Sequence, residues 1–374
     1  MDTPAAPAQD ARFAQAKAAF LAGLACQGQG DALQAEQHYL ASLALLPGRA
    51  STLVNLAATQ LQLARPADAL ASADAALAAE PDSADALWHR STALAQLGQV
   101  PPALEACQRL LALVPDHAPA WTTRGNLLRE TQRMDEAAAC FEQALRLGGD
   151  AALNAYYLAA VQTSATPPAT SPPAYVQGLF DAYAQDFDRH LLQSLHYRGH
   201  EELVALLLVH AGRAPGPAID LGCGTGLCGS LLRPHVGRLI GVDMSAGMLA
   251  QAARLGVYDH LEQADAVDFL RRCDERPGLL LAADVLIYIG DLQPLFAAAQ
   301  SALQQGLFAV SVEELEEQDA DFRLLPSLRY AHSRRYLQRL AATHGFAVLA
   351  MRATPVREDQ GQAVPALYLL LQRR

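Results

Sequence analysis

The sequence of 374 residues predicts two parts of different class, an all-α array of helical repeats followed by an α/β domain with a mostly parallel sheet. Three observations support this prediction. The first half has a period of 34 residues, an uncharged stretch of Pro, Ser, Thr and Ala lies at 163–174, and apolar strand-like runs alternate with helical segments from Tyr175 onward. The chain is long enough for two or three domains, each with its own core.

Composition and charge restrict the classes of function. Apolar residues make up 51% of the chain and charged residues 18%, which is typical of globular proteins. The net charge of −11 is spread over both halves, and neither half has the basic patch that DNA or RNA binding requires. The sequence contains no run of 18 apolar residues, no signal-peptide pattern at its first residues and no cysteine or histidine cluster with metal-ligand spacing. We therefore expect a cytoplasmic protein with reduced cysteines, no metal site and no membrane or nucleic-acid partner.

Three columns of residues define the repeat in the first half. Each unit is predicted to be a helical hairpin, because a proline follows every second helix and small residues recur where the helices would cross. The columns resemble those of the tetratricopeptide (TPR) repeat. They consist of Pro47, Pro81 and Pro115, of Ala35, Ala69, Ala103 and Ala137, and of Gly23, Ala57, Ser91 and Gly125.

The repeat and the linker together predict the domain boundaries. We expect a flexible N-terminus at 1–15, four TPR repeats at 16–150 and a capping helix at 151–163, which a solenoid needs to cover its last apolar face. A semi-stiff linker at 164–174 would then lead into the α/β domain at 175–374.

TPR arrays usually present a groove to a partner segment. The basic and amide residues with which some TPR grooves clamp a C-terminal carboxylate are missing here, so a groove would suit an apolar or helical partner. Docking of the array on its own catalytic domain, or self-association, is an equally supported alternative. The groove columns are Phe20, Val54, Trp88 and Thr122, then Leu24, Ala58, Thr92 and Asn126.

The α/β half begins with a strand that leads into a glycine-rich turn. The segment PAIDLGCGTG at 217–226 places three glycines after the strand, where a backbone without Cβ atoms can approach a bound cofactor. Two interpretations are open at this point. Residues 224–229, GTGLCG, match the GxGxxG pattern of dinucleotide sites, with Asp243 at the end of the second strand as the ribose ligand.

Three features favour a ligand with a sulfonium and an ammonium group over a pyrophosphate. The Asp220 carboxylate at the end of the first strand would repel a phosphate and attract a cation. Acids also follow the third and fourth strands, at Asp265 and Asp284. The last two strands, within 344–372, are joined so closely that they must form an antiparallel hairpin, which dinucleotide domains normally lack. Over about 175–374 these features resemble the class I S-adenosylmethionine (SAM) methyltransferases, whose first motif has the form D/E-x-G-x-G-x-G.

The resemblance implies a set of cofactor contacts. Asp220 would hold the amino group of SAM, Asp243 would bind both ribose hydroxyls, and Asp265 would accept from the adenine amino group. Met244 would pack on the adenine, and the N–H of Ala266 would donate to its ring. The remaining implied contacts, all with the methionine part, come from Gly222, Gly224, Gly226 and Asp284.

The combination of the two halves resembles the bacterial TPR-containing predicted methyltransferases labelled trans-aconitate-methyltransferase-like. In related small-molecule methyltransferases, a helix before the first strand covers the cofactor. Here it would bring Tyr183, Phe187 and Asp188 to SAM. Tyr197 and Arg198 are candidates to meet the SAM carboxylate. The spacing of Phe180, Tyr183 and Phe187 fits packing on the sheet equally well.

Methyl transfer from a sulfonium needs an aligned acceptor and exclusion of water, and it needs a base only where the acceptor must lose a proton. After the fourth strand the chain has DVLIY at 284–288, not the Asn/Asp-Pro-Pro-Tyr of enzymes that methylate nucleic-acid bases or glutamine, which argues against a nucleic-acid acceptor. The candidate catalytic groups are Tyr288, His332 and His196, since a histidine near its usual pKa can act as a base at neutral pH.

Three arginines flank His332 and could hold a carboxylate substrate, but we interpret them as the solvated face of a helix. They are Arg329, Arg334 and Arg335.

We expect a SAM-dependent methyltransferase that acts on a small-molecule, carrier-bound or protein acceptor, with the TPR array recruiting a partner or substrate. The first alternative is a TPR adaptor protein with a catalytically silent SAM-binding domain. The second, which has less support, is an NAD(P) oxidoreductase.

Overall fold

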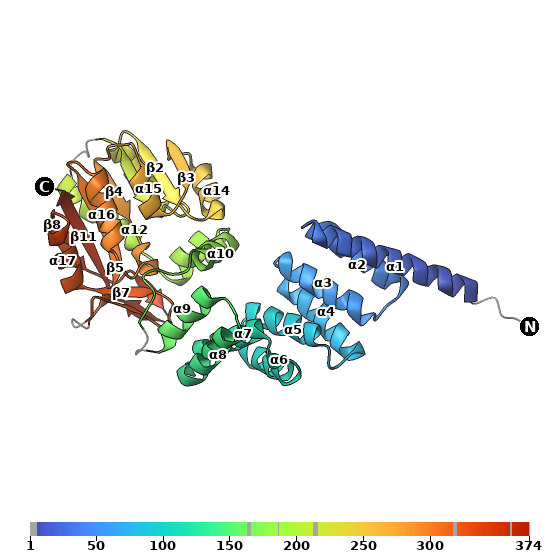
Figure 1. Cartoon of the computed structure of the whole chain (residues 1–374). Helices are drawn as coiled ribbons and strands as arrows, with labels where there is room; N and C mark the ends of the chain where they lie inside the picture. The colour runs from blue at the N-terminus through green and yellow to red at the C-terminus, as the bar shows by residue number, and fades with distance from the viewer. Residues whose placement is uncertain are drawn as a thin grey trace, which may run out of the picture. The chain divides into compact units, whose positions relative to one another are not determined.

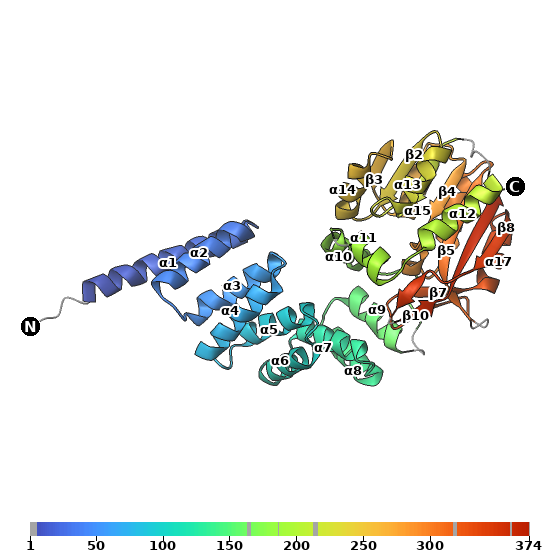
Figure 2. The same cartoon turned by 180° about the vertical axis from the view of Figure 1, so that it is seen from behind.

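The computed structural model describes residues 6–162, 166–185, 187–211, 216–316, 320–359 and 361–373. The chain divides into two compact units, Met1–Gln162 and Thr163–Arg374 (Figures 1 and 2). Within the described ranges, no helix combines the length and apolar character needed to cross a membrane.

The first unit consists of helices only, and each helix packs on the next along the chain (Figure 1). Four antiparallel pairs are followed by α9, so the predicted all-α repeat architecture is confirmed. The helices are α1 (Ala6–Gly28), α2 (Ala32–Leu45), α3 (Ala50–Gln62), α4 (Pro66–Ala79), α5 (Ala84–Gln96), α6 (Val100–Leu113), α7 (Ala118–Glu130), α8 (Met134–Arg146) and α9 (Ala151–Val161).

The small residues predicted at the helix crossings are matched to the size of the residue opposite. A Cβ atom on Gly23 would lie 2.5 Å from the Tyr39 ring, and one on Gly125 would lie 2.5 Å from the Phe141 ring. Glycine therefore stands where the facing column holds an aromatic ring. In the two middle repeats the glycine is replaced by a larger residue, Ala57 or Ser91. The aromatic ring opposite is replaced by a smaller side chain, that of Ala73 or Cys107.

The N-terminal end of this unit differs from the flexible segment that we predicted, whereas its C-terminal end has a helix where we predicted a capping helix. Helix α1 begins at Ala6, so the flexible N-terminus expected at 1–15 is wrong from Ala6 onward; residues 1–5 lie outside the described residues. The segment from Ala6 is rich in Ala and Gln, which favour a helix. At the other end, Asp150 caps α9 by accepting from the N–H of Leu153 at 2.9 Å, and the hydroxyl of Thr122 on α7 donates to Asn154 on α9 at 2.8 Å.

The second unit is built on a sheet with the order β3-β2-β1-β4-β5-β11-β8. The first five strands of this order pair in parallel, and β11 pairs antiparallel with both β5 and β8, so the predicted parallel sheet with a terminal antiparallel hairpin is confirmed. The strands are β1 (Ala218–Leu221), β2 (Leu239–Asp243), β3 (His260–Gln263), β4 (Leu279–Ala282), β5 (Leu307–Leu315), β8 (Phe346–Ala353) and β11 (Ala366–Arg373).

Alternating residues of the strands divide the apolar core between the two faces of the sheet. On one face, Ile219 and Leu221 of β1 pack in the same cluster as Phe296 and Leu337. On the other face, Ala218 packs in a cluster with residues of α12 and α13 (Figure 2). The helices are α12 (Gly199–Ala211), α13 (Leu227–Leu232), α14 (Ala246–Leu255), α15 (Ala266–Arg272), α16 (Gln293–Ala302) and α17 (Arg334–Thr343).

Two small additions follow β5 and β8, and the sequence analysis had not identified them. Strand β6 (Phe322–Leu324) pairs antiparallel with β7 (Tyr330–Ser333), and β7 also pairs in parallel with the last residues of β5. Strands β9 (Arg357–Asp359) and β10 (Gln362–Val364) form a separate two-stranded sheet. Each strand has three or four residues, too few for a clear periodic pattern.

The described part of the predicted linker is bound to the second unit. The carbonyl of Ala169 accepts from the N–H groups of Gly290 and Asp291, each at 2.9 Å, and the N–H of Ser171 donates to the carbonyl of Tyr288 at 2.9 Å. Residues 163–165 lie outside the described residues. The expectation of a semi-stiff linker over all of 164–174 is thus wrong for its second half, because backbone groups there pair with the loop after β4.

Candidate functional site

A cavity of about 660 Å³ opens at the carboxyl ends of β1, β2 and β4. This volume lies within the range of roughly 300–1,000 Å³ that is usual for small-molecule sites. In an open α/β sheet, ligands bind at this edge because the strand-to-helix turns converge there. The predicted cofactor residues that line the cavity are Asp220, Gly222, Gly224, Asp243, Met244, Asp265, Ala266, Asp284 and Tyr183, and the predicted catalytic residue Tyr288 lines it as well.

The glycine-rich turn after β1 has a backbone that favours glycine. Gly222 and Gly224 have φ values of +66° and +54°, which residues with a Cβ adopt at a cost. A Cβ on Gly222 would clash with Val285, whereas a Cβ on Gly224 would meet nothing within 4 Å. Gly222 therefore permits packing against the loop after β4, and Gly224 keeps the turn open on the cavity side.

Asp243 at the end of β2 is held by backbone donors. Its Oδ2 accepts from the N–H of Gly224 at 2.9 Å, and its Oδ1 accepts from the N–H of Ser245 at 2.8 Å. Burial raises the pKa of Asp243, and the N–H groups of Ser245, Gly224 and Met244 oppose that shift. A carboxylate has about four acceptor positions, so Asp243 retains capacity to accept a hydrogen bond from a ligand.

Asp220 on β1 is almost completely buried, with 1% of its surface exposed. The hydroxyl of Tyr258 donates to its Oδ2 at 2.7 Å. Burial raises the pKa of Asp220 to about 7, although the bond from Tyr258 works in the opposite direction. A cationic ligand group next to Asp220 would favour its ionised form.

Two further acids lie at the strand ends, and each has a local structural role. Asp265 caps α15, since its Oδ1 accepts from the N–H groups of Val267 and Asp268 at 2.8 and 3.1 Å. Asp284 has a φ of +57°, which is rare for a residue other than glycine, and its N–H donates to the hydroxyl of Ser311 at 2.9 Å. The unusual backbone at Asp284 is held in place beside the cavity, as strained residues at functional sites often are.

The described residues of 173–194, which we call the lid, include α10 (Pro173–Tyr183), α11 (Phe187–Arg189) and the π-helical turn η1 (His190–Ser194). Three hydrogen bonds attach the lid to the cofactor edge. Asp181 accepts from the hydroxyl of Ser245 at 2.5 Å and from the N–H of Gly247 at 3.1 Å, and Asp188 accepts from the hydroxyl of Thr225 at 2.5 Å.

The lid also contributes aromatic rings to the cavity wall. The ring of Phe180 packs edge-on against those of Phe187 and Tyr288, with centroids 5.8 and 5.5 Å away, and Tyr183 hydrogen-bonds to His190. All five residues line the cavity. The two interpretations of this helix left open by the sequence are therefore compatible, because the same rings pack together and face the cavity.

Two of the predicted cofactor residues do not line the cavity. Gly226 has a φ of +99° at the start of α13, and a Cβ there would lie 2.8 Å from Leu255, so its glycine serves packing between helices. The side chain of Arg198 is 68% exposed and forms ion pairs with Glu201 and Glu202 on the next turn. Its neighbour Tyr197 does line the cavity.

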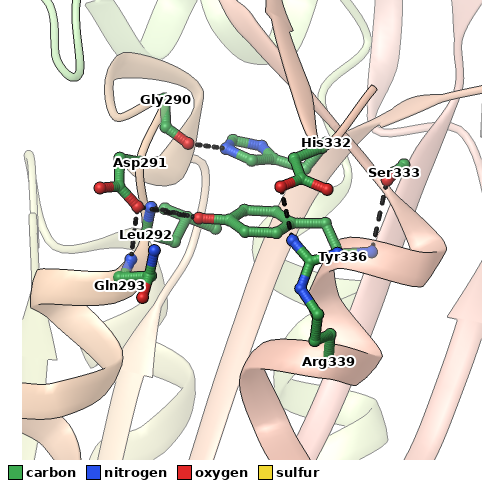
Figure 3. A network of polar contacts seen from close by, with 9 residues as sticks. Gly290, Asp291, Leu292, Gln293, His332, Ser333, Tyr336 and Arg339 are labelled. Carbon is green, nitrogen blue, oxygen red and sulfur yellow. Dashed lines mark hydrogen bonds and ion pairs between the residues drawn. The ribbon is translucent and has the colours of Figure 1, made fainter. Parts of the chain in front are cut away.

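The structure does not bring His332 to the cavity, so we correct its assignment as a catalytic candidate. His332 is completely buried, its Nε2 donates to the carbonyls of Ile289 and Gly290 at 2.9 and 3.1 Å, and its ring stacks on Tyr336 (Figure 3). Burial lowers the pKa of His332 to about 4. The hydroxyl of Tyr336 in turn accepts from the N–H of Leu292 and donates to Asp291. His332 thus belongs to a network that holds the loop after β4.

Tyr288 remains at the cavity, but its chemistry differs from that of a base. Burial raises the pKa of Tyr288 to about 12, although the nearby Arg329 lowers it. The phenol is therefore neutral at pH 7 and can donate a hydrogen bond or accept one. The third candidate, His196, is exposed and pairs with Glu358 at 3.0 Å.

Several cavity residues were not found by the sequence analysis. Thr225 follows the second glycine of the motif, and Arg357 comes from β9, far along the chain. His200 is also at the cavity, nearly buried and stacked on Tyr197 with 5.3 Å between the ring centroids. Only Thr225 lay within a recognisable motif; the others are brought to the site by tertiary structure alone.

Comparisons with known proteins agree with the two kinds of fold. A family model described as a methyltransferase domain matches residues 218–306, and one described as a tetratricopeptide repeat matches residues 118–151. The first match spans the predicted cofactor residues from Asp220 to Asp284.

Curated relatives match a shorter part of the chain. The trans-aconitate 2-methyltransferase of Pseudomonas aeruginosa is 44% identical over 80 residues, which are 21% of this chain and 28% of the relative. That of Pseudomonas paraeruginosa is 46% identical over 79 residues, 20% of this chain and 28% of the relative. The chain thus spans little more than a quarter of the length of these relatives.

Among solved structures, the chain is similar to magnesium protoporphyrin IX methyltransferase from Synechocystis PCC 6803 with bound SAH. The TM-score is 0.43 at 16% identity, over 54% of this chain and 99% of that chain. It is also similar to MamA, with a TM-score of 0.36 at 22% identity, over 37% of this chain and 81% of that chain.

Proposed function

We propose that this chain, in which a SAM-dependent methyltransferase domain follows tetratricopeptide repeats, transfers the methyl group of SAM to an acceptor bound in the same cavity. The observation that carries the proposal is the contact between the Gly224 N–H and the Asp243 carboxylate at the cavity wall. It places a carboxylate with free acceptor positions beside an open glycine turn, within the matched family segment.

The residues present fit SAM. Asp243 would bind the ribose hydroxyls through the acceptor positions that Gly224 and Ser245 leave free. Asp220 would face the amino group, because a buried carboxylate attracts a positively charged ligand. Met244 and Ala266 line the part of the cavity where the adenine would lie. When bound, SAM supplies an electrophilic methyl group on its sulfonium.

The protein's contribution to the transfer would be alignment and the exclusion of water. The aromatic rings of Phe180, Tyr183 and Phe187 cover the cavity, and the bonds from Asp181 and Asp188 hold the lid on the turns after β1 and β2. Since the phenol of Tyr288 is neutral at pH 7, it would orient the acceptor by hydrogen bonding and would not remove a proton.

The TPR array would recruit a partner or a substrate to the chain, and the acceptor would be a small molecule, a carrier-bound group or a protein. Several groove residues make contacts within the array: the ring of Phe20 lies 5.9 Å from that of Tyr39, and that of Trp88 lies 5.0 Å from that of His117. Leu24 is exposed, so the apolar character expected for a partner site is kept at this position.

Calorimetric titration of the full chain with SAM, S-adenosylhomocysteine (SAH) and NADH tests the proposal. We expect micromolar binding of the two sulfur ligands and no binding of NADH. Binding of NADH alone would make GTGLCG the relevant motif and the chain an oxidoreductase. If none of the three binds, the proposal fails and a TPR adaptor becomes the better assignment.

A further inference from the structure

The turn between β6 and β7 carries an arginine to the cavity. Arg329 lines the cavity and its side chain is 25% exposed, whereas Arg334, which the sequence analysis grouped with it, lies at the start of α17 and pairs with Glu314 at 3.0 Å. The turn is closed by the N–H of Leu325, which donates to the carbonyl of Arg329 at 2.8 Å. The interpretation of Arg329 as part of a solvated helix face is therefore wrong.

The backbone of this turn is held in an unfavourable conformation. Leu328, next to Arg329, has a φ of +64° although it is not glycine, and its side chain is buried. Such a conformation is unfavourable for a residue with a Cβ and persists only where the surrounding structure imposes it. Packing of Leu328 thus fixes the position from which Arg329 reaches the cavity.

The guanidinium of Arg329 has few partners among the described residues. Its charge lowers the pKa of the nearby Tyr288 phenol, and its Nη1 lies 3.9 Å from the carboxylate of Asp359, which is beyond hydrogen-bonding distance. A guanidinium has five N–H donors in a fork that matches a carboxylate or phosphate. Most of these donors are left for a ligand.

The second arginine that lines the cavity, Arg357, forms ion pairs with two carboxylates. Arg357 is almost fully buried, and its guanidinium is paired with Glu313 and with Asp284 at 3.4 Å. These two carboxylates neutralise Arg357, and Glu313, which also feels the charge of Arg329, is held by Arg357. The charge of Arg329 is therefore less closely paired with carboxylates than that of Arg357.

Most of the remaining wall at this end is apolar, and the polar residues Thr170 and Ser171, which also line the cavity, carry no charge. Residues of α10 and of the loop after β4 line the cavity together with Tyr288, and they offer no charge to a ligand. An acceptor that fills this space would bury apolar or aromatic surface, because apolar burial is the main favourable term available there. The residues are Val176, Leu179, Phe180 and Ile289.

We propose that Arg329 binds an anionic group, a carboxylate or a phosphate, on a methyl acceptor whose remaining part is apolar or aromatic and packs between α10 and the loop after β4. This proposal rests on the proposed function, since it assigns the acceptor side of the same cavity. Acidic residues line the cofactor side, and Arg329 gives the acceptor side the opposite charge.

Binding of a matched pair of probes tests this inference. The full-length protein is first saturated with SAH, and its affinities for 3-phenylpropanoate and for the neutral 3-phenylpropanamide are then measured by calorimetry. We expect the acid to bind at least tenfold more tightly than the amide, since a hydrogen bond to a charged group contributes more than one to a neutral group. In the Arg329→Gln variant the two affinities should come within twofold of each other.

Two variants serve as controls. Arg334→Gln removes an arginine that lies outside the cavity and should leave the preference for the acid unchanged. Arg329→Lys keeps the charge without the fork and should retain part of the preference. The affinity for SAH should stay within twofold of the wild type in all three variants.

Equal binding of acid and amide to the wild type would overturn the inference, as would binding of neither probe or an acid preference that survives Arg329→Gln. A loss of SAH affinity in Arg329→Gln would assign the arginine to the cofactor and also overturn it. If the wild-type protein does not bind SAH at all, the proposed function has failed, which is a separate result.

Discussion

The N–H of Gly224 donates to Oδ2 of Asp243 at 2.9 Å, and this bond joins the turn after β1 to the end of β2. The two residues are 19 positions apart, and parallel pairing of β1 with β2 brings them together. Because Asp243 also accepts from the N–H of Ser245, its carboxylate is fixed before any ligand binds. Such pre-organisation reduces the cost of ordering the site on binding.

Replacement of Asp243 by Asn should weaken SAM binding at least tenfold and leave the fold intact. The amide keeps one acceptor oxygen for the backbone donors but loses the charge and the second acceptor that the ribose hydroxyls would use. Calorimetry with SAM and SAH measures the effect. Asp268→Asn is the matched control, because this exposed residue of α15 does not line the cavity. Unchanged affinity in Asp243→Asn would show that the ligand does not use this carboxylate.

SAM binding should weaken as the pH falls below 7. The pKa of Asp220 is raised to about 7 in the folded protein, so its carboxyl becomes protonated below that pH and no longer attracts the cationic ligand. Affinity should fall by up to tenfold per pH unit. In Asp220→Asn this dependence should disappear, while Tyr258→Phe, which removes a bond that lowers the pKa, should move the midpoint to higher pH. A wild-type affinity that is flat between pH 5 and 8 would contradict this assignment.

The contact between Thr225 and Asp188 should keep the lid ordered. Thr225→Val removes the hydroxyl that donates to the carboxylate but keeps the side-chain volume nearly the same. We expect amide hydrogen exchange in residues 173–194 to become about ten- to a hundredfold faster, because a bond to a charged group contributes roughly 1.5–3 kcal/mol. Ser230→Ala, which removes a hydroxyl bonded within α13, is the control and should leave lid exchange unchanged. Equal exchange in both variants would mean that the aromatic contacts alone hold the lid.

His332→Gln should lower stability without affecting cofactor binding. The imidazole fills a buried site and donates to the carbonyls of Ile289 and Gly290, so its replacement should cost about 1–3 kcal/mol. Thermal unfolding measures the loss, and SAH affinity should remain within twofold of the wild type. A stable variant with impaired SAH binding would restore His332 as a site residue.

The wild-type contribution of His332 to stability also depends on pH. Its pKa is lowered to about 4 in the folded protein, below the usual value near 6.5 of an unfolded chain. The unfolded state therefore binds a proton that the folded state does not, and this residue's share of stability is lost as the pH falls from 6.5 to 4. The His332→Gln variant should lack this share of the pH dependence.

Alanine at Gly23 or Gly125 should destabilise the array. The added methyl group would lie 2.5 Å from the ring of Tyr39 or Phe141, and such overpacking typically costs 1–3 kcal/mol. Gly28→Ala is the control, because a Cβ at the end of α1 would meet nothing within 4 Å. Urea unfolding of the full chain, monitored in the helical array by Trp88 and Trp121 fluorescence, compares the three variants. Equal midpoints would show that the helices can separate at these crossings without cost.

The helical repeat, the α/β class and the glycine-rich turn could all be predicted from the amino-acid sequence, because each depends on spacing along the chain. A period of 34 residues places Gly23 and Gly125 at the same position of their hairpins, and the residue opposite each follows 16 positions later. Likewise, acids directly after parallel strands meet at one edge of the sheet, whatever the details of packing. The family match later confirmed the class of domain.

The set of side chains that reach the cavity could not be predicted in the same way, because it depends on how distant segments pack. His332 and Arg329 are three residues apart, yet the short pairing of β6 with β7 buries His332 against the loop after β4 and turns Arg329 toward the cavity. Arg198 points to solvent, whereas His200, two residues later, lines the cavity from α12. Local pattern gives the identity of a residue and its element, but its exposure depends on contacts between segments far apart in the chain, and those contacts form only when the whole sheet and its lid have assembled.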